Sequence, residues 1–319
     1  MSGEAGRISL ERIEEAASVI DPVFLNSPEI AFAPHEHPLG ADLTLKVETL
    51  NPVRCFKGRG GDFVVRQRAG SGPLVVASAG NFGQGIAYAA RSLGIPLTIY
   101  AAETANTLKI ERMRDLGAEV ILEGRDFDAA KDAARAHAER HGQHFIEDGQ
   151  DPAVSEGAGT MALELLRGDA RYDALLVPLG NGAMINGIGT WVKHRSPETQ
   201  VIGVCATGAP SMERSWRSGR VETTKEAATI ADGIAVRVPV PEALDDMNGI
   251  VDDVLLVDDS VTLEAMRLIL LHAGLLAEPS GAIGLAALMA HKARFEGQRL
   301  AAPLCGGNVT REQFQAWFT

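Results

Sequence analysis

Short runs of apolar, often β-branched residues alternate with longer segments of helical pattern along most of this chain. We expect strands at residues 74–77, 95–101, 118–123, 173–179, 201–206 and 254–258. We expect helices at residues 84–93, 108–116, 127–140 and 261–272, with a further helix running into Trp191. Glycine follows the first three helical segments within two residues, as is typical of a helix C-terminus. Strands that alternate with helices at this spacing predict parallel sheets covered by helices on both faces.

The strand–helix units fall into two blocks, which predicts an α/β fold with two doubly wound parallel-sheet domains. Residues 45–143 are expected to form the smaller domain, and residues 1–44 plus 144–319 the larger one. An amphipathic helix over residues 10–20 is expected to pack back on the larger domain. In open α/β sheets, ligands bind at the carboxyl ends of the strands, beside helix N-termini. Glycine-rich turns directly after strands are therefore the first candidates for a functional site.

The composition limits the classes of partner. The 319 residues are 45% hydrophobic and 23% charged, as in a globular protein with a sizeable core. The formal net charge of −12 argues against nucleic acid or an anionic membrane surface as a partner. The three cysteines show no metal-type spacing, and the N-terminus lacks the apolar segment of a signal peptide. No uncharged apolar stretch reaches the roughly 18 residues of a membrane span, so we expect a soluble protein of the cytoplasm.

One lysine stands apart from the others. Lys57 lies between Phe56 and Gly58 in the segment NPVRCFKGRGG, an apolar and glycine-rich setting. A lysine that acts as a nucleophile must lose its proton, and apolar surroundings favour the neutral amine. Arg54 and Arg59 would add to this effect if they lay close. The alternative is a solvated lysine in a basic loop.

Two glycine-rich turns follow predicted strands and precede predicted helices. In ASAGNFGQG, residues 77–85, the glycines let the backbone approach a ligand, while Ser78 and Asn81 offer hydrogen bonds or simply cap the helix. In VPLGNGAMINGIG, residues 177–189, free N–H groups at a helix start favour an anion. This second turn lacks the third glycine of a dinucleotide fingerprint and the Lys-Ser/Thr ending of a P-loop. It predicts an anion site without nucleotide specificity, which disfavours a nicotinamide dehydrogenase.

Two C-terminal segments complete the candidates. Glu278 begins the segment EPSGA at the start of an alanine-rich helix, and its structural alternative is a helix cap. Cys305 in LCGGN ends an apolar run, where a cysteine is usually a small buried hydrophobe. His35 and His37 have no third ligand near in sequence, so we expect a surface turn there and no metal site.

The joint order of these segments resembles the pyridoxal-phosphate enzymes of the tryptophan-synthase-β fold (fold type II), and within them the threonine/serine dehydratase and serine racemase group. The resemblance runs from about Pro22 to Asn308 and implies pyridoxal 5'-phosphate as the cofactor. It implies that Lys57 forms the covalent Schiff base with the cofactor and removes the substrate's Cα proton. It implies further cofactor contacts by Phe56, Asn81, Gly180, Asn181, Gly182, Ala183, Met184, Glu278 and Cys305. It implies substrate binding, chiefly of the carboxylate, by Ser78, Ala79, Gly80, Asn81 and Phe82.

Several residues depart from the family pattern. Ala79 stands where serine racemases carry a second serine, so racemisation by that route is expected to be poor. Cys205 and Ser211 stand where the family's divalent-metal ligands lie, so no activation through a metal is expected there. The GNGAM loop, and Phe82 in place of a histidine, leave the preferred substrate open. Only eleven residues follow Asn308, so no regulatory domain is expected.

The leading hypothesis is β-elimination, in which water or ammonia leaves a small hydroxy or β-substituted L-amino acid such as serine or threonine. The products would be a 2-keto acid and ammonia. The alternatives are β- or γ-replacement, as in threonine synthase or cysteine synthase, a racemase, and a non-catalytic paralogue that binds the cofactor or a metabolite. The intact Lys57, Asn81 and Cys305 speak against the last of these. The resemblance also implies a homodimer.

Overall fold

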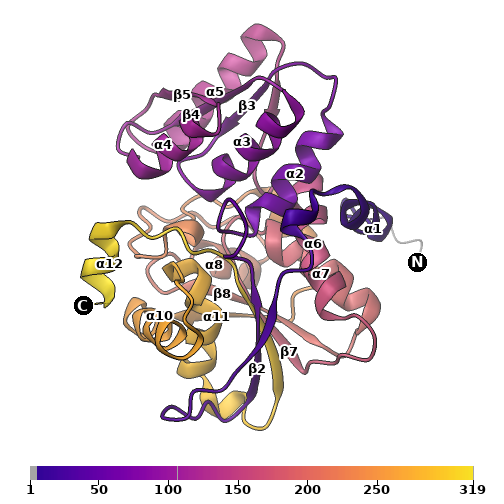
Figure 1. Cartoon of the computed structure of the whole chain (residues 1–319), viewed down its shortest axis with the longest axis vertical. Helices are drawn as coiled ribbons and strands as arrows, with labels where there is room; N and C mark the ends of the chain where they lie inside the picture. The colour runs from indigo at the N-terminus through magenta and orange to yellow at the C-terminus, as the bar shows by residue number, and fades with distance from the viewer. Residues whose placement is uncertain (1–5, 106, 319) are drawn as a thin grey trace.

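A computed structural model describes residues 6–105 and 107–318 as two lobes, each built around one sheet (Figure 1). The sheet of the larger lobe has the order β1-β2-β10-β7-β8-β9, and only the β1–β2 pair in it is antiparallel. Its strands are Glu29–Phe32 (β1), Asp42–Val47 (β2), Arg299–Leu304 (β10), Ala174–Pro178 (β7), Gln200–Ala206 (β8) and Asp253–Val257 (β9). The sheet of the smaller lobe is parallel throughout, in the order β5-β4-β3-β6. Its strands are Glu119–Leu122 (β5), Leu97–Ala101 (β4), Leu74–Ala77 (β3) and His144–Ile146 (β6).

Helices connect most of these strands and cover the sheets. The first half of the chain contains Leu10–Val19 (α1), Lys57–Gln67 (α2), Asn81–Leu93 (α3), Thr107–Asp115 (α4), Phe127–His141 (α5) and Pro152–Leu165 (α6). The second half contains Ala183–Arg195 (α7), Ser211–Ser218 (α8), Pro241–Asp246 (α9), Asp259–Ala273 (α10), Pro279–Ala290 (α11) and Arg311–Phe318 (α12). Short 3-10 helices lie at Pro22–Phe24 (η1), Asp232–Ile234 (η2) and Lys292–Arg294 (η3). Among the described residues, we find no helix with the length and apolar character needed to cross a membrane.

The larger sheet is buried on both faces, as the uninterrupted apolar strands predict. Along β7, Leu176 packs into the hydrophobic cluster that contains α10 and α11. Its neighbours Leu175 and Val177 point the other way and pack with α6 and α7. This alternation follows from the two-residue period of a strand, with both sets of side chains apolar. The predicted fold class, two doubly wound α/β domains, is confirmed.

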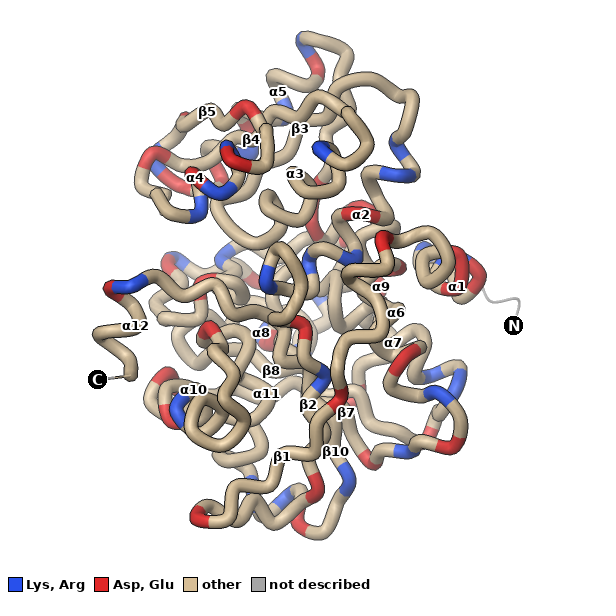
Figure 2. Tube along the Cα trace, viewed as in Figure 1, with Lys and Arg blue, Asp and Glu red and all other residues tan. Residues whose placement is uncertain are grey.

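The predicted elements are present, and the differences lie at their ends. Each expected strand is found within two residues of its predicted bounds, whereas α3 begins at Asn81, three residues before the expected helix. The predicted helix near the N-terminus is α1, which packs on α6 and α7 of the larger lobe, as expected. Figure 2 shows acidic and basic residues mixed along the trace in both lobes.

Sheet membership corrects the expected division at residues 45 and 143. Residues 45–47 belong to β2, which pairs in parallel with β10 in the larger sheet. Residues 144–146 form β6, which pairs with β3 in the smaller sheet. The second difference has a local cause, because β6 is only three residues long and includes the exposed His144, so it shows no strand pattern in the sequence.

Candidate active site

A cavity of about 410 Å³ lies between the two lobes, at the carboxyl ends of strands from both sheets. Its walls include residues 77–82 at the end of β3 and directly after it, residues 180–184 after β7 and residues 232–238 around η2. The structure brings all of the expected site residues to this one cavity. They are Phe56, Lys57, Ser78, Ala79, Gly80, Asn81, Phe82, Gly180, Asn181, Gly182, Ala183, Met184, Glu278 and Cys305.

Helix α2 carries Lys57 at its first position and is held between α3 and α6 by glycine contacts. A Cβ atom on Gly60 would lie 2.4 Å from the carbonyl oxygen of Val154 in α6. A Cβ atom on Gly61 would lie 2.8 Å from the carbonyl carbon of Gly85 in α3. Glycine is a poor helix former, so the KGRGG sequence is explained by the close approach of these three helices. The same packing fixes the backbone from which Lys57 projects.

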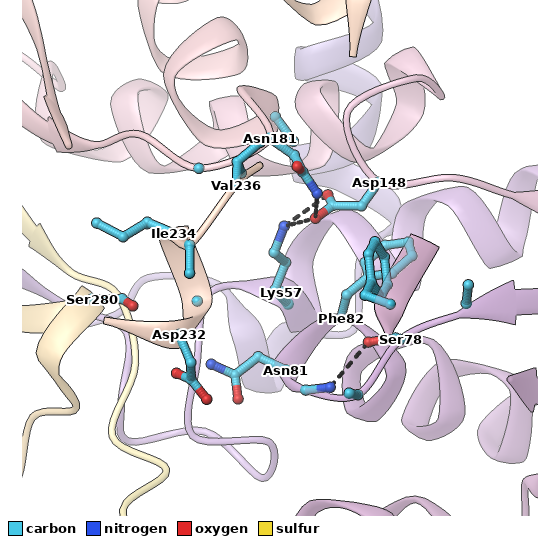
Figure 3. Close-up of a pocket in the computed structure, with 18 of the residues that line it drawn as sticks. Lys57, Ser78, Asn81, Phe82, Asp148, Asn181, Asp232, Ile234, Val236 and Ser280 are labelled. Carbon is cyan, nitrogen blue, oxygen red and sulfur yellow. Dashed lines mark hydrogen bonds and ion pairs between the residues drawn. The ribbon is translucent and has the colours of Figure 1, made fainter. Parts of the chain in front are cut away.

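The Lys57 side chain reaches into the cavity and pairs with an aspartate from the smaller lobe (Figure 3). Its Nζ atom lies 2.7 Å and 2.6 Å from the two carboxylate oxygens of Asp148. The same atom lies 4.9 Å and 5.5 Å from the ring centroids of Phe56 and Phe82. The hypothesis of a solvated lysine in a basic loop is therefore wrong, because both partners of the pair are mostly buried.

From the sequence, Arg59 was expected to favour the neutral amine of Lys57 if the two side chains lay close. In the structure, the Arg59 side chain instead pairs with two glutamates. Its guanidinium is fully buried and binds the carboxylates of Glu48 and Glu164 at 2.9 Å and 2.7 Å. Lys46 adds a second cation to Glu164 at 2.7 Å. Burial opposes the charge on Glu164, but Arg59 and Lys46 outweigh it and lower the pKa of this carboxyl to about 2. Arg59 therefore belongs to a buried ionic network beneath the site.

The turn before α3 is shaped by the Ser78 side chain. The hydroxyl oxygen of Ser78 accepts hydrogen bonds from the backbone N–H groups of Gly80 at 3.2 Å and Gly83 at 2.9 Å. Ser78 therefore does have the capping role that was its structural alternative, and it also lines the cavity. The first N–H groups of α3 lack intrahelical partners and face the helix start, where a carboxylate is favourably bound.

The turn before α7 offers a second helix N-terminus to the cavity. Gly182 precedes α7 with a φ of +89°, a conformation that favours glycine. A Cβ atom there would also lie 3.0 Å from the Cβ atom of Ala243. Helix α7 is 13 residues long, so its dipole and its unpaired N–H groups make an anion site next to Ala183 and Met184.

Three polar residues from different segments form a network on the floor of the cavity. The Asn81 side-chain amide donates to the Glu278 carboxylate at 2.7 Å and accepts from Asn308 at 2.8 Å. The backbone N–H of Asn308 donates to the other Glu278 oxygen at 2.9 Å. Burial, reinforced by the charge of Asp232 and opposed by Lys109, raises the pKa of Glu278 to about 7. Glu278 occupies the N-cap position of α11, but its side chain makes no capping hydrogen bond and instead ties α3 to the segment after β10.

Cys305 lies beside this network at the end of β10. Its thiol donates to the backbone carbonyl of Ser280 at 3.4 Å. Burial, together with the nearby Glu278 charge, raises the pKa of Cys305 well above its ordinary value, so the thiol is neutral. The Ser280 hydroxyl is buried at the cavity wall, and its oxygen has no hydrogen-bond partner in the described part of the chain.

Two ion pairs join the lobes across the cavity. Lys109 of α4 binds Asp232 of η2, and Arg237 binds Asp128 of α5. Burial opposes the charge on Lys109, but the carboxylates of Asp232 and Glu278 raise its pKa overall. Both pairs connect the smaller lobe to the segment around η2, so they link the two lobes on that side of the cavity.

Sequence reasoning missed Asp148, Lys109, Asp232 and Ser280. Asp148 was missed because β6 was not recognised, although an acidic residue just after a parallel strand is a usual signal of a site. Lys109 lies in a predicted helix among polar and charged neighbours in the sequence, but it is buried and faces the cavity. Ser280 lies in the segment EPSGA, of which only Glu278 was given a role, and Asp232 lies in a stretch with no predicted strand or helix.

Comparison with known proteins now identifies the family. A family described as pyridoxal-phosphate dependent enzyme matches residues 21–306. The chain belongs to this family. It is 36% identical to an L-threonine ammonia-lyase of Thermotoga maritima over 95% of this chain and 76% of that protein. It is 35% identical to an L-threo-3-hydroxyaspartate ammonia-lyase of a Pseudomonas species over 86% of this chain and 87% of that protein. The solved structure of a threonine deaminase from T.th. superposes with a TM-score of 0.89 at 34% identity, covering 95% of this chain and 99% of that one.

The residues around the cavity fit the pyridoxal-phosphate cofactor of this family. The α7 N-terminus suits a phosphate, and Lys57 supplies an amine inside the cavity. The neutral Cys305 thiol and the unpartnered Ser280 hydroxyl line the same cavity and would offer the cofactor's ring nitrogen an uncharged partner. Family membership removes the nicotinamide dehydrogenase hypothesis, in agreement with the missing third glycine.

Proposed function

We propose that this chain is a pyridoxal-phosphate-dependent lyase that eliminates the β-substituent of a small L-amino acid such as threonine or serine. The products are a 2-keto acid and ammonia. One observation carries the proposal: a single cavity holds a mostly buried lysine amine together with two helix N-termini suited to two different anions. The names of the relatives, L-threonine ammonia-lyase and L-threo-3-hydroxyaspartate ammonia-lyase, support the same class of reaction.

We assign each cavity residue a role in binding the cofactor, binding the substrate or moving a proton. The cofactor, when bound, supplies an electron sink that makes the substrate's Cα–H bond acidic. The α7 N-terminus at residues 180–184 holds its phosphate, and Phe56 with Asn81 orients its ring. The α3 N-terminus and Ser78 hold the substrate carboxylate, which fixes the Cα–H bond toward Lys57. Lys57 takes the Cα proton as general base. The neutral thiol of Cys305 is a weak donor, which favours prompt loss of the β-group.

Racemisation and replacement are the competing reactions on such a site. Ala79 lines the cavity and has no proton to deliver to Cα, which disfavours racemisation. Replacement requires a second nucleophile to bind beside the substrate, and the ion pair of Arg237 with Asp128 already occupies part of the cavity wall. We therefore place elimination first. A non-catalytic role would require a silent Lys57, although this residue lies within the cavity.

A direct assay tests the proposal. Purified protein is mixed with pyridoxal phosphate, and the visible absorbance of the bound cofactor is recorded beside a Lys57→Ala control. Keto acid and ammonia are then measured with L-serine, L-threonine, L-threo-3-hydroxyaspartate and 2,3-diaminopropionate. We expect both products in equal amounts from a hydroxy amino acid, and only when Lys57 is present.

The other results separate the alternatives. A bound cofactor with product only when an added nucleophile is supplied would mean replacement, and inverted amino acid without keto acid would mean racemisation. A bound cofactor with no reaction on any substrate would favour a binding protein. Absence of the visible band would overturn the cofactor assignment.

We further propose a homodimer located in the cytoplasm. The resemblance to the dehydratase group supports the dimer. The buried and unpaired state of Cys55, Cys205 and Cys305 suits a reducing compartment. Light scattering on the purified protein would give the oligomeric state, and fractionation of the producing cells would give the compartment.

A further inference from the structure

The side-chain charges around the cavity indicate which charge is favoured on the substrate's β-substituent. The two anions of the proposed reaction, the phosphate and the substrate carboxylate, are bound by backbone N–H groups at the starts of α7 and α3. Among the described residues that line the cavity, six are acidic and four are basic, so the side chains add net negative charge. A cavity of this kind favours a cation on the remaining part of the substrate.

Asp148 is the carboxylate best placed to bind such a cation. Both of its oxygens face Lys57 Nζ, at 2.7 Å and 2.6 Å, and one lies 3.4 Å from the side-chain nitrogen of Asn181 (Figure 3). Only 15% of its side chain is exposed. Other carboxylates at the cavity keep cations of their own: Asp232 pairs with Lys109, and Glu147 pairs with Lys131. Asp148 therefore depends on Lys57 for its counter-charge.

In the proposed function, Lys57 Nζ would be bonded to the cofactor and would no longer be free to pair with Asp148 as an ammonium group. A partly buried carboxylate without a partner is costly, so a substrate cation at this position is favoured. The substrate's α-amine takes the place of Lys57 Nζ during the reaction. The β-substituent is attached one carbon beyond the carbon that bears this amine. A carboxylate in contact with the α-amine position is therefore also within reach of the β-group.

We propose that Asp148 is a specificity-determining residue that selects substrates with a cationic β-substituent, of which 2,3-diaminopropionate is the simplest. This inference deepens the proposed function and rests on it. The Cβ–N bond breaks, ammonia leaves with the bonding electron pair, and Lys57 takes the proton from Cα. Addition of one water to the remaining fragment gives pyruvate and a second ammonia. An anionic β-group, such as the carboxylate of 3-hydroxyaspartate, is repelled by Asp148.

The first test compares substrates on the native holoenzyme. We expect kcat/KM for 2,3-diaminopropionate to exceed that for L-threo-3-hydroxyaspartate, with two ammonia molecules released for each pyruvate from the diamine. The variant Asp148→Asn removes the charge and keeps the shape. It is expected to lower kcat/KM for the diamine by roughly tenfold to hundredfold, the size of a lost charge-assisted hydrogen bond. The loss with serine is expected to be much smaller.

A binding measurement provides a readout that does not depend on turnover. In Lys57→Ala protein loaded with the cofactor, calorimetry gives the dissociation constants of the diamine and of serine. Adding Asp148→Asn to this variant should raise the dissociation constant of the diamine much more than that of serine. Asp126→Asn is the matched control, since it removes a carboxylate from the same cavity while asparagine preserves the helix cap that Asp126 gives to α5.

Three results would overturn the inference. One is turnover of serine or threonine with no product from the diamine, which leaves the proposed function intact. Another is an equal fall in kcat/KM for serine and for the diamine in Asp148→Asn, which would mean that Asp148 only positions the α-amine that both substrates share. The third is no keto acid from any substrate, which would remove the proposed function and this inference with it. If Asp148→Asn does not fold, the ratio of kcat/KM values for the two substrates on the native enzyme still tests the inference.

Discussion

Gly85 and Lys57 meet through their backbones where α3 crosses the start of α2. A Cβ atom on Gly85 would lie 2.6 Å from the carbonyl oxygen of Lys57 and 2.9 Å from its carbonyl carbon. Neither atom is at the end of a flexible side chain, so a larger residue at position 85 must move the backbone that carries the lysine. The position of the Lys57 amine is therefore set by a glycine 28 residues further along the chain.

The variant Gly85→Ala tests this relationship. Overpacking at a buried contact costs about 1–3 kcal/mol, and a shift of the lysine should lower kcat well beyond that of a merely destabilised protein. Denaturant unfolding gives the stability, and the keto-acid assay gives kcat. Ala90→Gly is the control, because it weakens the same helix by at least about 1 kcal/mol through a buried residue that is not among the contacts of Gly85. Equal kcat values in the two variants would contradict the positioning role of Gly85.

Glu278 gives the protein a pH dependence of stability with a defined direction. Burial raises its pKa from the ordinary 4.5 to about 7. A carboxyl whose pKa is higher in the folded state binds its proton more tightly there, so its stabilising effect is complete below pH 4.5 and is lost as the pH rises to 7. The loss is on the order of 3 kcal/mol at most.

The variant Glu278→Gln isolates this effect. The amide keeps an oxygen for the Asn81 hydrogen bond but does not titrate, so the free energy of unfolding of the cofactor-free variant should fall less than that of the native protein between pH 5 and about 7. Denaturant titrations across this range provide the measurement. Glu14→Gln, on the exposed face of α1, is the control and should follow the native curve. Parallel curves for native protein and Glu278→Gln would show that Glu278 does not titrate in this range.

The buried network around Arg59 is expected to control stability rather than chemistry. Arg59→Met leaves the buried Glu48 with no arginine partner and takes one of the two cations from Glu164. Removing one partner of a buried ion pair typically costs about 3–5 kcal/mol, so we expect a large fall in the denaturation midpoint. Arg68→Ala, which breaks the more exposed pair with Asp151, should cost under about 1 kcal/mol. A small effect of Arg59→Met would mean that methionine packing compensates for the lost charge.

The sequence predicted what depends on local pattern and missed what depends on contacts between distant segments. Strands such as β3 and β7 are apolar along their whole length, and glycine turns mark the helix starts, so the fold and the cavity walls could be inferred. Strand β6 could not, because its three residues carry no alternation and it forms only by pairing with β3. Missing β6 concealed Asp148.

The charged residues of the site were hidden for a different reason. Arg59 follows Lys57 by two residues, yet the helical turn directs it into the network under the site. Lys109 has the sequence surroundings of a surface residue, and only the docking of α4 against η2 buries it. Partner choice for a long charged side chain is a tertiary property, so one sequence does not specify it.

The ion pair between Arg237 and Asp128 is expected to act on substrate affinity. It joins α5 of the smaller lobe to the segment after η2, and both side chains line the cavity. Both are also partly exposed, so the pair should contribute under about 1 kcal/mol. Arg237→Ala should therefore raise KM by a factor of about 2–5, with kcat nearly unchanged. Steady-state kinetics on Arg237→Ala, Asp128→Ala and the double variant give the coupling energy, and the double variant should resemble either single one.

Arg220→Ala, which breaks the exposed pair with Glu222 on one lobe, is the control and should leave KM unchanged. A fall in kcat at constant KM would instead mean that Arg237 acts on the reacting groups, and additive effects would mean that the two side chains act independently.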